Sequence, residues 1–178
     1  MKFNFKSCSE EELWKFVGSH LSKNNFDAVL VGGAVVSIYS EGAYQSGDLD
    51  FIIQNLIKDR LPDVMKQIGF IKSGRYYKHP ECNHLFVEFP TGPLEIGDDH
   101  TIKPNIQKKD GIEIKILTPT DCIKDRLASY IYFKSQEGLD QAVLVARSQS
   151  FNKTAVKRWC EGEDADFAFK DFIEKLRK

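Results

Sequence analysis

Apolar and polar residues follow a helical period at both ends of this chain and a strand-like period in the middle. Ser9 and Glu12 form a capping-box pattern, and apolar residues recur at helical spacing from Leu13 to Leu21, which predicts a helix through about residue 22. The short apolar run Ala28–Val31 is typical of a buried strand. The pattern then predicts a helix over 33–40, a strand over Asp48–Ile53 and a helix over 61–68.

The middle of the chain changes to short β-like segments separated by turn residues. Strands are predicted over 70–73, 75–78, 84–89, 94–96 and 112–117. Thr118-Pro119-Thr120-Asp121 then has the form of a helix start, and helices are predicted near 119–134, 138–149, 153–161 and 164–177. We therefore expect an α/β part over residues 1–117 and a C-terminal helical segment over 118–178 packed on it.

Composition narrows the class of protein. With 178 residues, 42% of them hydrophobic, the chain can build one soluble domain. It has no apolar run of membrane-spanning length and no basic-then-apolar signal pattern, so we expect a cytoplasmic protein with no membrane contact. The four cysteines lack CxxC pairing, which predicts reduced thiols. A net charge of −1 argues against broad nonspecific binding of nucleic acid, although a local basic patch stays open.

The segment 29–53 carries the most informative chemistry. Asp48 and Asp50 are two apart on a predicted strand, so their carboxylates share one face while Leu49 and Phe51 point to the other. A solvated edge strand is the alternative, but the apolar residues that follow favour a buried strand, where carboxylates need cations. Gly32-Gly33, between strand and helix, offers backbone N–H groups to phosphate or simply forms a tight turn.

Together these features resemble a known family. An apolar strand ending in two glycines, a helix-length gap and then DLDFII resembles the signature of the nucleotidyltransferase superfamily, the fold of the DNA polymerase beta palm. SGDLDFII after VGGAVV is most similar to small prokaryotic members that include AbiEii-type toxins, and TPTDCIKDRLASYIYFKSQEGLDQAV extends the resemblance loosely. The resemblance implies a mixed sheet flanked by helices and transfer of a nucleoside monophosphate from an NTP to a hydroxyl. Two Mg²⁺ (or Mn²⁺) ions would be held by two aspartates and a third carboxylate.

The resemblance also assigns roles to individual residues. Gly32 and Gly33 would cradle the triphosphate, Asp48 and Asp50 would hold the metal ions, and Ser46 would face the phosphates. This chain has Gly33 where relatives often have serine, so the missing hydroxyl would have to come from Ser46 or Ser37. The stretch 34–47 is slightly long, and Tyr44 or Gln45 stands where a basic residue is common.

The remaining assignments leave alternatives open. Glu88 is the preferred third carboxylate because HLFVEF is the strongest middle strand; Glu95 is the competitor, and a plain strand-surface role for Glu88 remains open. Lys124 would reach a phosphate and Asp140 matches an acid of a later helix in the relatives. For both of these residues a solvated helix face is an equal alternative.

The expected function is therefore a Mg²⁺-dependent nucleotidyltransferase with an NTP substrate. Resemblance to the toxin members implies an RNA or tRNA acceptor and an antitoxin partner, while aminoglycosides and protein hydroxyls are acceptors elsewhere in the superfamily. The alternative is a catalytically inactive module of the same fold that binds nucleotide or protein.

Two further clusters in the middle of the chain have simpler explanations. His79, Cys82 and His84 have the density of a zinc site, but no fourth ligand is evident and an ordinary loop is favoured. The run 75–78 interleaves basic and aromatic residues as a nucleic-acid surface does, and an exposed hairpin is favoured.

Overall fold

A computed structural model describes residues 3–55 and 58–178. A seven-stranded mixed sheet has the order β3-β4-β5-β2-β1-β7-β6. β1 runs antiparallel to β2 and parallel to β7, and β2 runs parallel to β5. The strands are β1 (Ala28–Val31), β2 (Asp48–Ile53), β3 (Ile71–Ser73), β4 (Tyr76–His79), β5 (Cys82–Glu88), β6 (Asn105–Lys109) and β7 (Ile112–Ile116).

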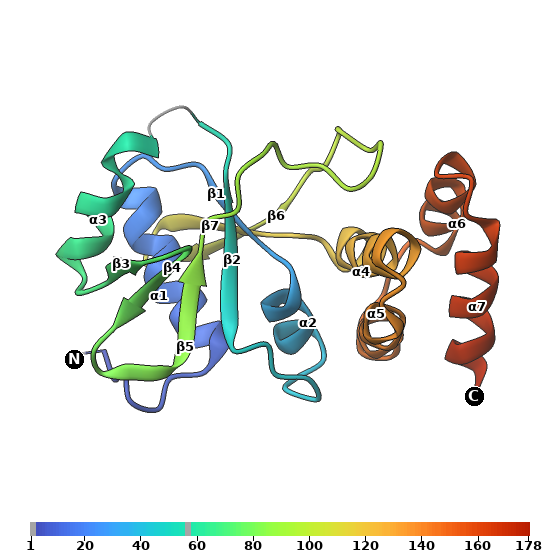
Figure 1. Cartoon of the computed structure of the whole chain (residues 1–178), viewed down its shortest axis with the longest axis horizontal. Helices are drawn as coiled ribbons and strands as arrows, with labels where there is room; N and C mark the ends of the chain where they lie inside the picture. Colours follow the sequence, from blue (N-terminus) through green and yellow to red (C-terminus); the bar gives the residue numbers. More distant parts are fainter. Residues whose placement is uncertain (1–2, 56–57) are drawn as a thin grey trace.

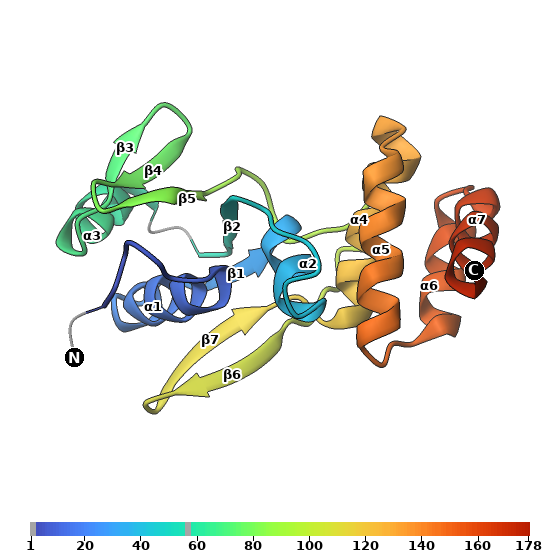
Figure 2. The same cartoon turned by 90° about the horizontal axis from the view of Figure 1, so that it is seen from below.

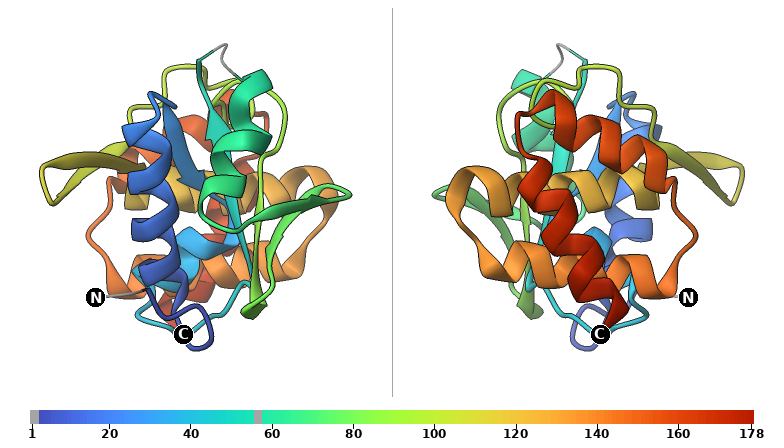
Figure 3. Two further views of the ribbon diagram at one scale, coloured as in Figure 1. Left: turned by 90° about the vertical axis from the view of Figure 1, so that its left-hand side faces the viewer. Right: turned by 90° about the vertical axis from the view of Figure 1, so that its right-hand side faces the viewer.

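Helices pack on this sheet and extend beyond one end of it. α1 lies against β1 and β7, and α2 lies against β1 and β2. α4 to α7 stand together beyond α2 (Figures 1 and 2), with α6 and α7 packed against α4 and α5 on their outer side (Figure 3). The helices are α1 (Glu10–Lys23), α2 (Gly33–Tyr39), the short η1 (Lys58–Arg60), α3 (Leu61–Gln67), α4 (Pro119–Phe133), α5 (Gln136–Ser148), α6 (Lys153–Gly162) and α7 (Asp166–Arg177).

Local sequence explains where these helices begin. Ser9 and Glu12 cap α1 reciprocally, since each side chain bonds the other's backbone N–H. The Thr118 hydroxyl accepts from the N–H of Asp121 at the start of α4. α5 begins two residues earlier than the predicted 138 because the side chain of Ser135 caps it. The predicted helices are otherwise confirmed to within a few residues.

The sheet departs from the prediction at two places. The segment 94–96 is not a strand; it contributes a single bridge from Ile96 to Asp99. β6 was not expected, because its sequence NIQKK is largely polar. It forms as an edge strand paired with β7 across the Asp110-Gly111 turn, where both residues have positive φ as such two-residue hairpins require. An edge strand needs a hydrogen-bonded neighbour on one side only, so an apolar pattern is not required.

A continuous apolar core joins the sheet to the C-terminal helices. It includes Leu49 and Phe51 of β2, Leu127 of α4 and Phe172 of α7, all with no exposed side-chain surface. The sheet and the helices therefore hold one another in fixed positions, so residues of α4 and α5 can complete a site on the strands. Within residues 3–55 and 58–178, no helix is both long and apolar enough to cross a bilayer.

Candidate functional site

Three carboxylates meet on two neighbouring strands. Asp48 and Asp50 project from β2 and Glu88 from β5, and the two strands run parallel with Asp50 directly opposite Glu88. One oxygen from each carboxylate lies within 4.8 Å of the others. Such an arrangement of oxygen ligands suits Mg²⁺ or Mn²⁺, which bind carboxylates together with water and phosphate oxygens.

The alternating burial of β2 explains why its acids face the site. Leu49 and Phe51 have no exposed side-chain surface and Ile53 is 3% exposed, while Asp48 and Asp50 are half-buried on the opposite face. The expected division of the strand into an apolar face and an acidic face is confirmed. A shift of one residue in register would exchange the two faces, so core packing fixes the position of both aspartates.

Electrostatic repulsion within this cluster is strong. Burial, the largest cause, and the neighbouring charges of Asp48 and Glu88 together raise the pKa of Asp50 to about 7, although the positive charge of Arg126 opposes them. Bringing like charges together in a half-buried site costs folding free energy, and a bound cation would remove that cost. The donor set and its raised pKa therefore fit a hard divalent cation.

The two glycines are required by close approach to this cluster. Gly32 has φ +72°, and a Cβ there would lie 2.6 Å from an Oδ of Asp50. A Cβ at Gly33 would lie 2.6 Å from the hydroxyl oxygen of Ser46. The absence of side chains thus allows the start of α2 to lie directly against the acidic cluster.

Ser46 links the glycine turn to the acids. Its hydroxyl donates to Oδ1 of Asp48 over 2.9 Å, and its backbone N–H donates to the carboxylate of Glu10 in α1 over 3.1 Å. The hydroxyl of Ser46 lies where a side chain at position 33 would begin. Ser46 therefore provides, beside the glycine turn, the hydroxyl group that a serine at position 33 would carry in other proteins.

The structure separates the two candidates for the third carboxylate. Glu88 belongs to the cluster and is 17% exposed, and Arg75 approaches its outer oxygen, with Nε at 3.4 Å. Glu95 lies outside the strands, 41% exposed and paired with His100. Of these two acids, Glu88 is the one that the fold brings to Asp48 and Asp50.

Lys124 is placed elsewhere. Its buried ammonium donates to Asp99 and to Asp121, each over 3.1 Å, and lines a cleft of about 560 Å³ with Arg158 and Trp159. Its charge is thereby compensated by two carboxylates outside the acidic cluster. The resemblance implied that Lys124 would reach a phosphate, with a solvated helix face as the alternative; the structure shows it buried and paired with these two aspartates.

Asp140 is also placed away from the acidic cluster. Its carboxylate, about half exposed, pairs with Lys175 of α7. This contact links α5 to α7. At Asp140, which the resemblance matched to an acid of the relatives, the structure therefore shows a surface ion pair.

The sequence interpretation did not identify Arg126 as a site residue. Its guanidinium, 16% exposed, lowers the pKa of Asp50 and donates to Asp125 and to Gln141 of α5. Residues two apart on a helix point about 200° apart, so Lys124 and Arg126 cannot serve the same site. The helical period of α4 was thus the available signal, because it allows only one of the two cations Lys124 and Arg126 to face the strands.

Tyr44 also lies at the site, although the sequence interpretation noted it only as one of two residues that stand where a basic residue is common. One edge carbon of its ring would lie 3.5 Å from a Cβ at Gly33. Burial and the nearby Glu137 carboxylate raise the pKa of Tyr44. The charge of Asp48 also raises it, and the charge of Arg126 lowers it. The phenol therefore lies between the glycine turn and the α4–α5 pair.

Comparison with solved structures agrees with this architecture. A nucleotidyltransferase-like antigenic protein from Paracoccidioides brasiliensis matches with a TM-score of 0.61 and 16% identity over 94% of each chain. The chain has a nucleotidyltransferase-like fold. The solution structure of the antibiotic-resistance factor ANT(2'')-Ia matches with a TM-score of 0.53 and 10% identity, and the match covers 94% of this chain and 96% of that one. The crystal structure of ANT(2'')-Ia with adenylyl-2''-tobramycin matches with a TM-score of 0.51 and 10% identity, and the match covers 92% of this chain and 98% of that one.

At these identities the nucleotidyltransferase-like fold is what the comparisons establish. No protein-family model and no curated protein sequence matches the chain. The expected mixed α/β fold is confirmed. The particular similarity to AbiEii-type toxins remains a prediction from the sequence.

Proposed function

We propose that this protein is a divalent-metal-dependent nucleotidyltransferase that moves a nucleoside monophosphate from an NTP to a hydroxyl. The observation that carries the proposal is the convergence of Asp48, Asp50 and Glu88 within 4.8 Å, against a glycine turn. The nucleotidyltransferase-like fold supports the same reaction class. The three clustered carboxylates by themselves would support only metal binding; the adjoining glycine turn adds room for a phosphate group.

Each residue has a distinct part in this proposal. Asp48, Asp50 and Glu88 would hold Mg²⁺ or Mn²⁺, which would neutralise the triphosphate and lower the pKa of the attacking hydroxyl. Ser46 orients the Asp48 carboxylate through its hydrogen bond. Gly32 and Gly33 leave space beside the acids for the phosphates. The reaction would then depend mainly on positioning and charge neutralisation.

The C-terminal helices complete the proposed site from the side. Arg126 supplies the positive charge that faces Asp50, and Gln141 of α5 holds its guanidinium over 3.1 Å. α4 and α5 are tightly packed because Gly138 lies against the backbone of Arg126, where a Cβ would approach its carbonyl oxygen to 2.6 Å. In this proposal the segment 118–178 positions Arg126 and helps to select the base and the acceptor, and Lys124 has no part in the nucleotide site.

The acceptor is proposed to be an RNA end, with tRNA as the first substrate to test. This follows the resemblance to toxin members, which also implies an antitoxin partner. A short contact with a tRNA terminus needs few cations, in keeping with a net charge of −1. A small aminoglycoside is the competing acceptor, since one structure of ANT(2'')-Ia holds adenylyl-2''-tobramycin.

The test is pyrophosphate release and label transfer from each of the four NTPs, with Mg²⁺ or Mn²⁺, onto total RNA, purified tRNA and an aminoglycoside panel. Asp48→Asn and Asp50→Asn should each abolish transfer. Asp63→Asn, an exposed carboxylate on α3, is the matched control and should retain it. Full activity in Asp50→Asn would overturn the proposed mechanism, and transfer to aminoglycosides alone would overturn the RNA acceptor.

The second candidate is an inactive module with the same fold that binds nucleotide or protein. The contact between Arg75 and Glu88 favours it, because a guanidinium 3.4 Å from the third carboxylate competes with a metal ion. NTP binding by calorimetry without turnover, both in the wild type and in Arg75→Ala, would support the module. Turnover in either protein would exclude it.

A further inference from the structure

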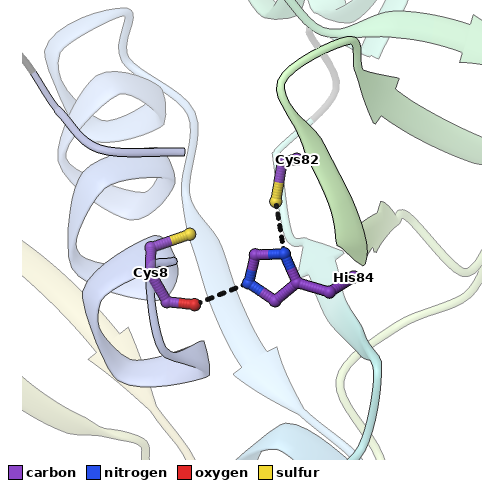
Figure 4. Close-up of side chains that lie close together, drawn as sticks. All are labelled: Cys8, Cys82 and His84. Carbon is purple, nitrogen blue, oxygen red and sulfur yellow. Dashed lines mark hydrogen bonds between the residues drawn. The ribbon is translucent and has the colours of Figure 1, made fainter. Parts of the chain in front are cut away.

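A second group of potential metal ligands lies apart from the acidic cluster. Cys8 precedes α1, and Cys82 and His84 belong to β5 (Figure 4). One ligand atom from each of the three lies within 4.8 Å of the other two. Residues more than seventy positions apart in the chain are thus brought to one point by the fold.

His84 is oriented as a metal-binding histidine would be. Its Nε2 lies 2.8 Å from the backbone carbonyl oxygen of Cys8, which can only accept, so Nε2 carries the proton. The lone pair is therefore on Nδ1, which lies 3.9 Å from the sulfur of Cys82. A backbone carbonyl that fixes one imidazole nitrogen while the other faces a ligand site is the usual arrangement around protein metals.

The separations suit zinc. With Zn–S bonds of about 2.3 Å and Zn–N bonds of about 2.0 Å, tetrahedral geometry places ligand atoms roughly 3.5 to 3.8 Å apart. The distance from Nδ1 of His84 to Sγ of Cys82 is 3.9 Å, so a small rotation of the side chains would suffice. Mixed sulfur and nitrogen ligands select a softer cation than the three carboxylates do.

Access to this group is open on one side. Both thiols are buried, Cys8 at 5% and Cys82 at 1% exposure, while His84 is exposed. Cys8 and His84 line a cleft together with Glu10, Glu12 and Lys6, so two carboxylates face one ammonium group there. This cleft provides an entry path and room for a fourth ligand.

Other residues of the same kind do not join the group. His79, which the sequence interpretation placed beside Cys82 and His84, is stacked on the ring of Phe5, and its Nδ1 accepts from the N–H of Glu81. Among the residues that the structure describes, Cys122 and Cys160 belong to no comparable group of ligand atoms. The selection of two cysteines and one histidine is therefore specific to this place in the fold.

We propose that Cys8, Cys82 and His84 form a zinc site, with a water molecule from the cleft as the fourth ligand. On binding, each thiol gives its proton to solvent and forms a Zn–S bond, and Nδ1 of His84 donates its lone pair. The ion would join the segment before α1 to β5, the strand that carries Glu88. This site is independent of the proposed transfer reaction.

The test uses the full chain, prepared metal-free under reductant and without oxygen, titrated with Zn²⁺ and with Co²⁺ as its spectroscopic substitute. We expect one thiolate-bound Zn²⁺ per chain, an intense thiolate-to-cobalt band near saturation, and a higher melting temperature with zinc. Loss of a residue that merely orients a ligand costs about 10- to 100-fold in affinity, so Cys8→Ser and Cys82→Ser should each weaken binding by at least about 100-fold.

Three further variants keep the result interpretable. His84→Ala changes an exposed side chain and should weaken cobalt binding while the circular dichroism spectrum stays unchanged. Cys160→Ser, a thiol elsewhere in the core, and Asp50→Asn, in the acidic cluster, should keep the cobalt band. Absence of the band in the wild type, or its persistence in both Cys8→Ser and Cys82→Ser, would overturn the zinc site.

Discussion

The charge on Asp50 is expected to destabilise the metal-free protein, and Asp50→Asn should reveal this. Burial and two neighbouring carboxylates raise its pKa from 3.8 to about 7. A carboxyl with a raised pKa is favoured in its neutral form by the folded state, so stability is lost as the pH rises from about 4 to about 7. Asparagine resembles the neutral carboxyl and avoids that loss.

The magnitude follows from the size of the shift. The difference between 3.8 and about 7 is about 3 pKa units, which corresponds to at most about 4 kcal/mol at 1.36 kcal/mol per unit. Water and salt screen the exposed part of the carboxyl, so we expect a gain of roughly 1 to 3 kcal/mol at pH 8 in EDTA. The gain should shrink steadily toward pH 5, where the wild-type carboxyl is protonated in the folded state.

Urea denaturation with and without Mg²⁺ measures this effect. A metal ion at about 100 times its dissociation constant stabilises the wild type by about 2.7 kcal/mol, and the asparagine variant should not respond. The advantage of the variant in EDTA should therefore be cancelled or reversed when Mg²⁺ replaces EDTA. Asp63→Asn, on the surface of α3, should change stability by less than about 0.5 kcal/mol in either buffer. If Asp50→Asn is no more stable than the wild type at pH 8 in EDTA, the repulsion inferred for the cluster is wrong.

Three further substitutions test the contacts around the acids. Gly32→Ala should lose metal binding, and it should lose more stability than Gly42→Ala. Both glycines have positive φ, but only the Cβ at position 32 would meet Asp50, while the Cβ at position 42 would meet nothing within 4 Å. Equal losses of stability in urea denaturation would contradict this. Ser46→Ala should keep the fold and weaken Mg²⁺ binding by about 10- to 100-fold in calorimetry, since it only orients a ligand; unchanged affinity would remove it from the site. Arg126→Met should move the pH midpoint of Mg²⁺ binding upward, because the guanidinium lowers the pKa of Asp50; a midpoint that stays fixed would show that its charge does not reach the cluster.

Elements whose signals are local could be predicted from the residues alone. The capping residues fixed the starts of α1 and α4, and the alternation in DLDFII fixed which face of β2 carries the aspartates. These signals depend on neighbours within a few residues, so they are readable without a fold. The same reasoning identified Gly32-Gly33 and placed an acid on β5, although it left Glu88 and Glu95 as alternatives.

Contacts between distant segments of the chain became known only from the fold. Parallel pairing of β2 with β5 selected Glu88, and the packing of α4 brought Arg126 toward Asp50 while Lys124 went to another pair of aspartates. The fold also brought Cys8 to Cys82 and His84, a grouping that no spacing along the chain reveals. Side chains from distant segments meet only because the packed core fixes the order of the strands and the orientation of the helices. The local pattern of residues encodes strand order and helix orientation only weakly, so these contacts could not be predicted from it.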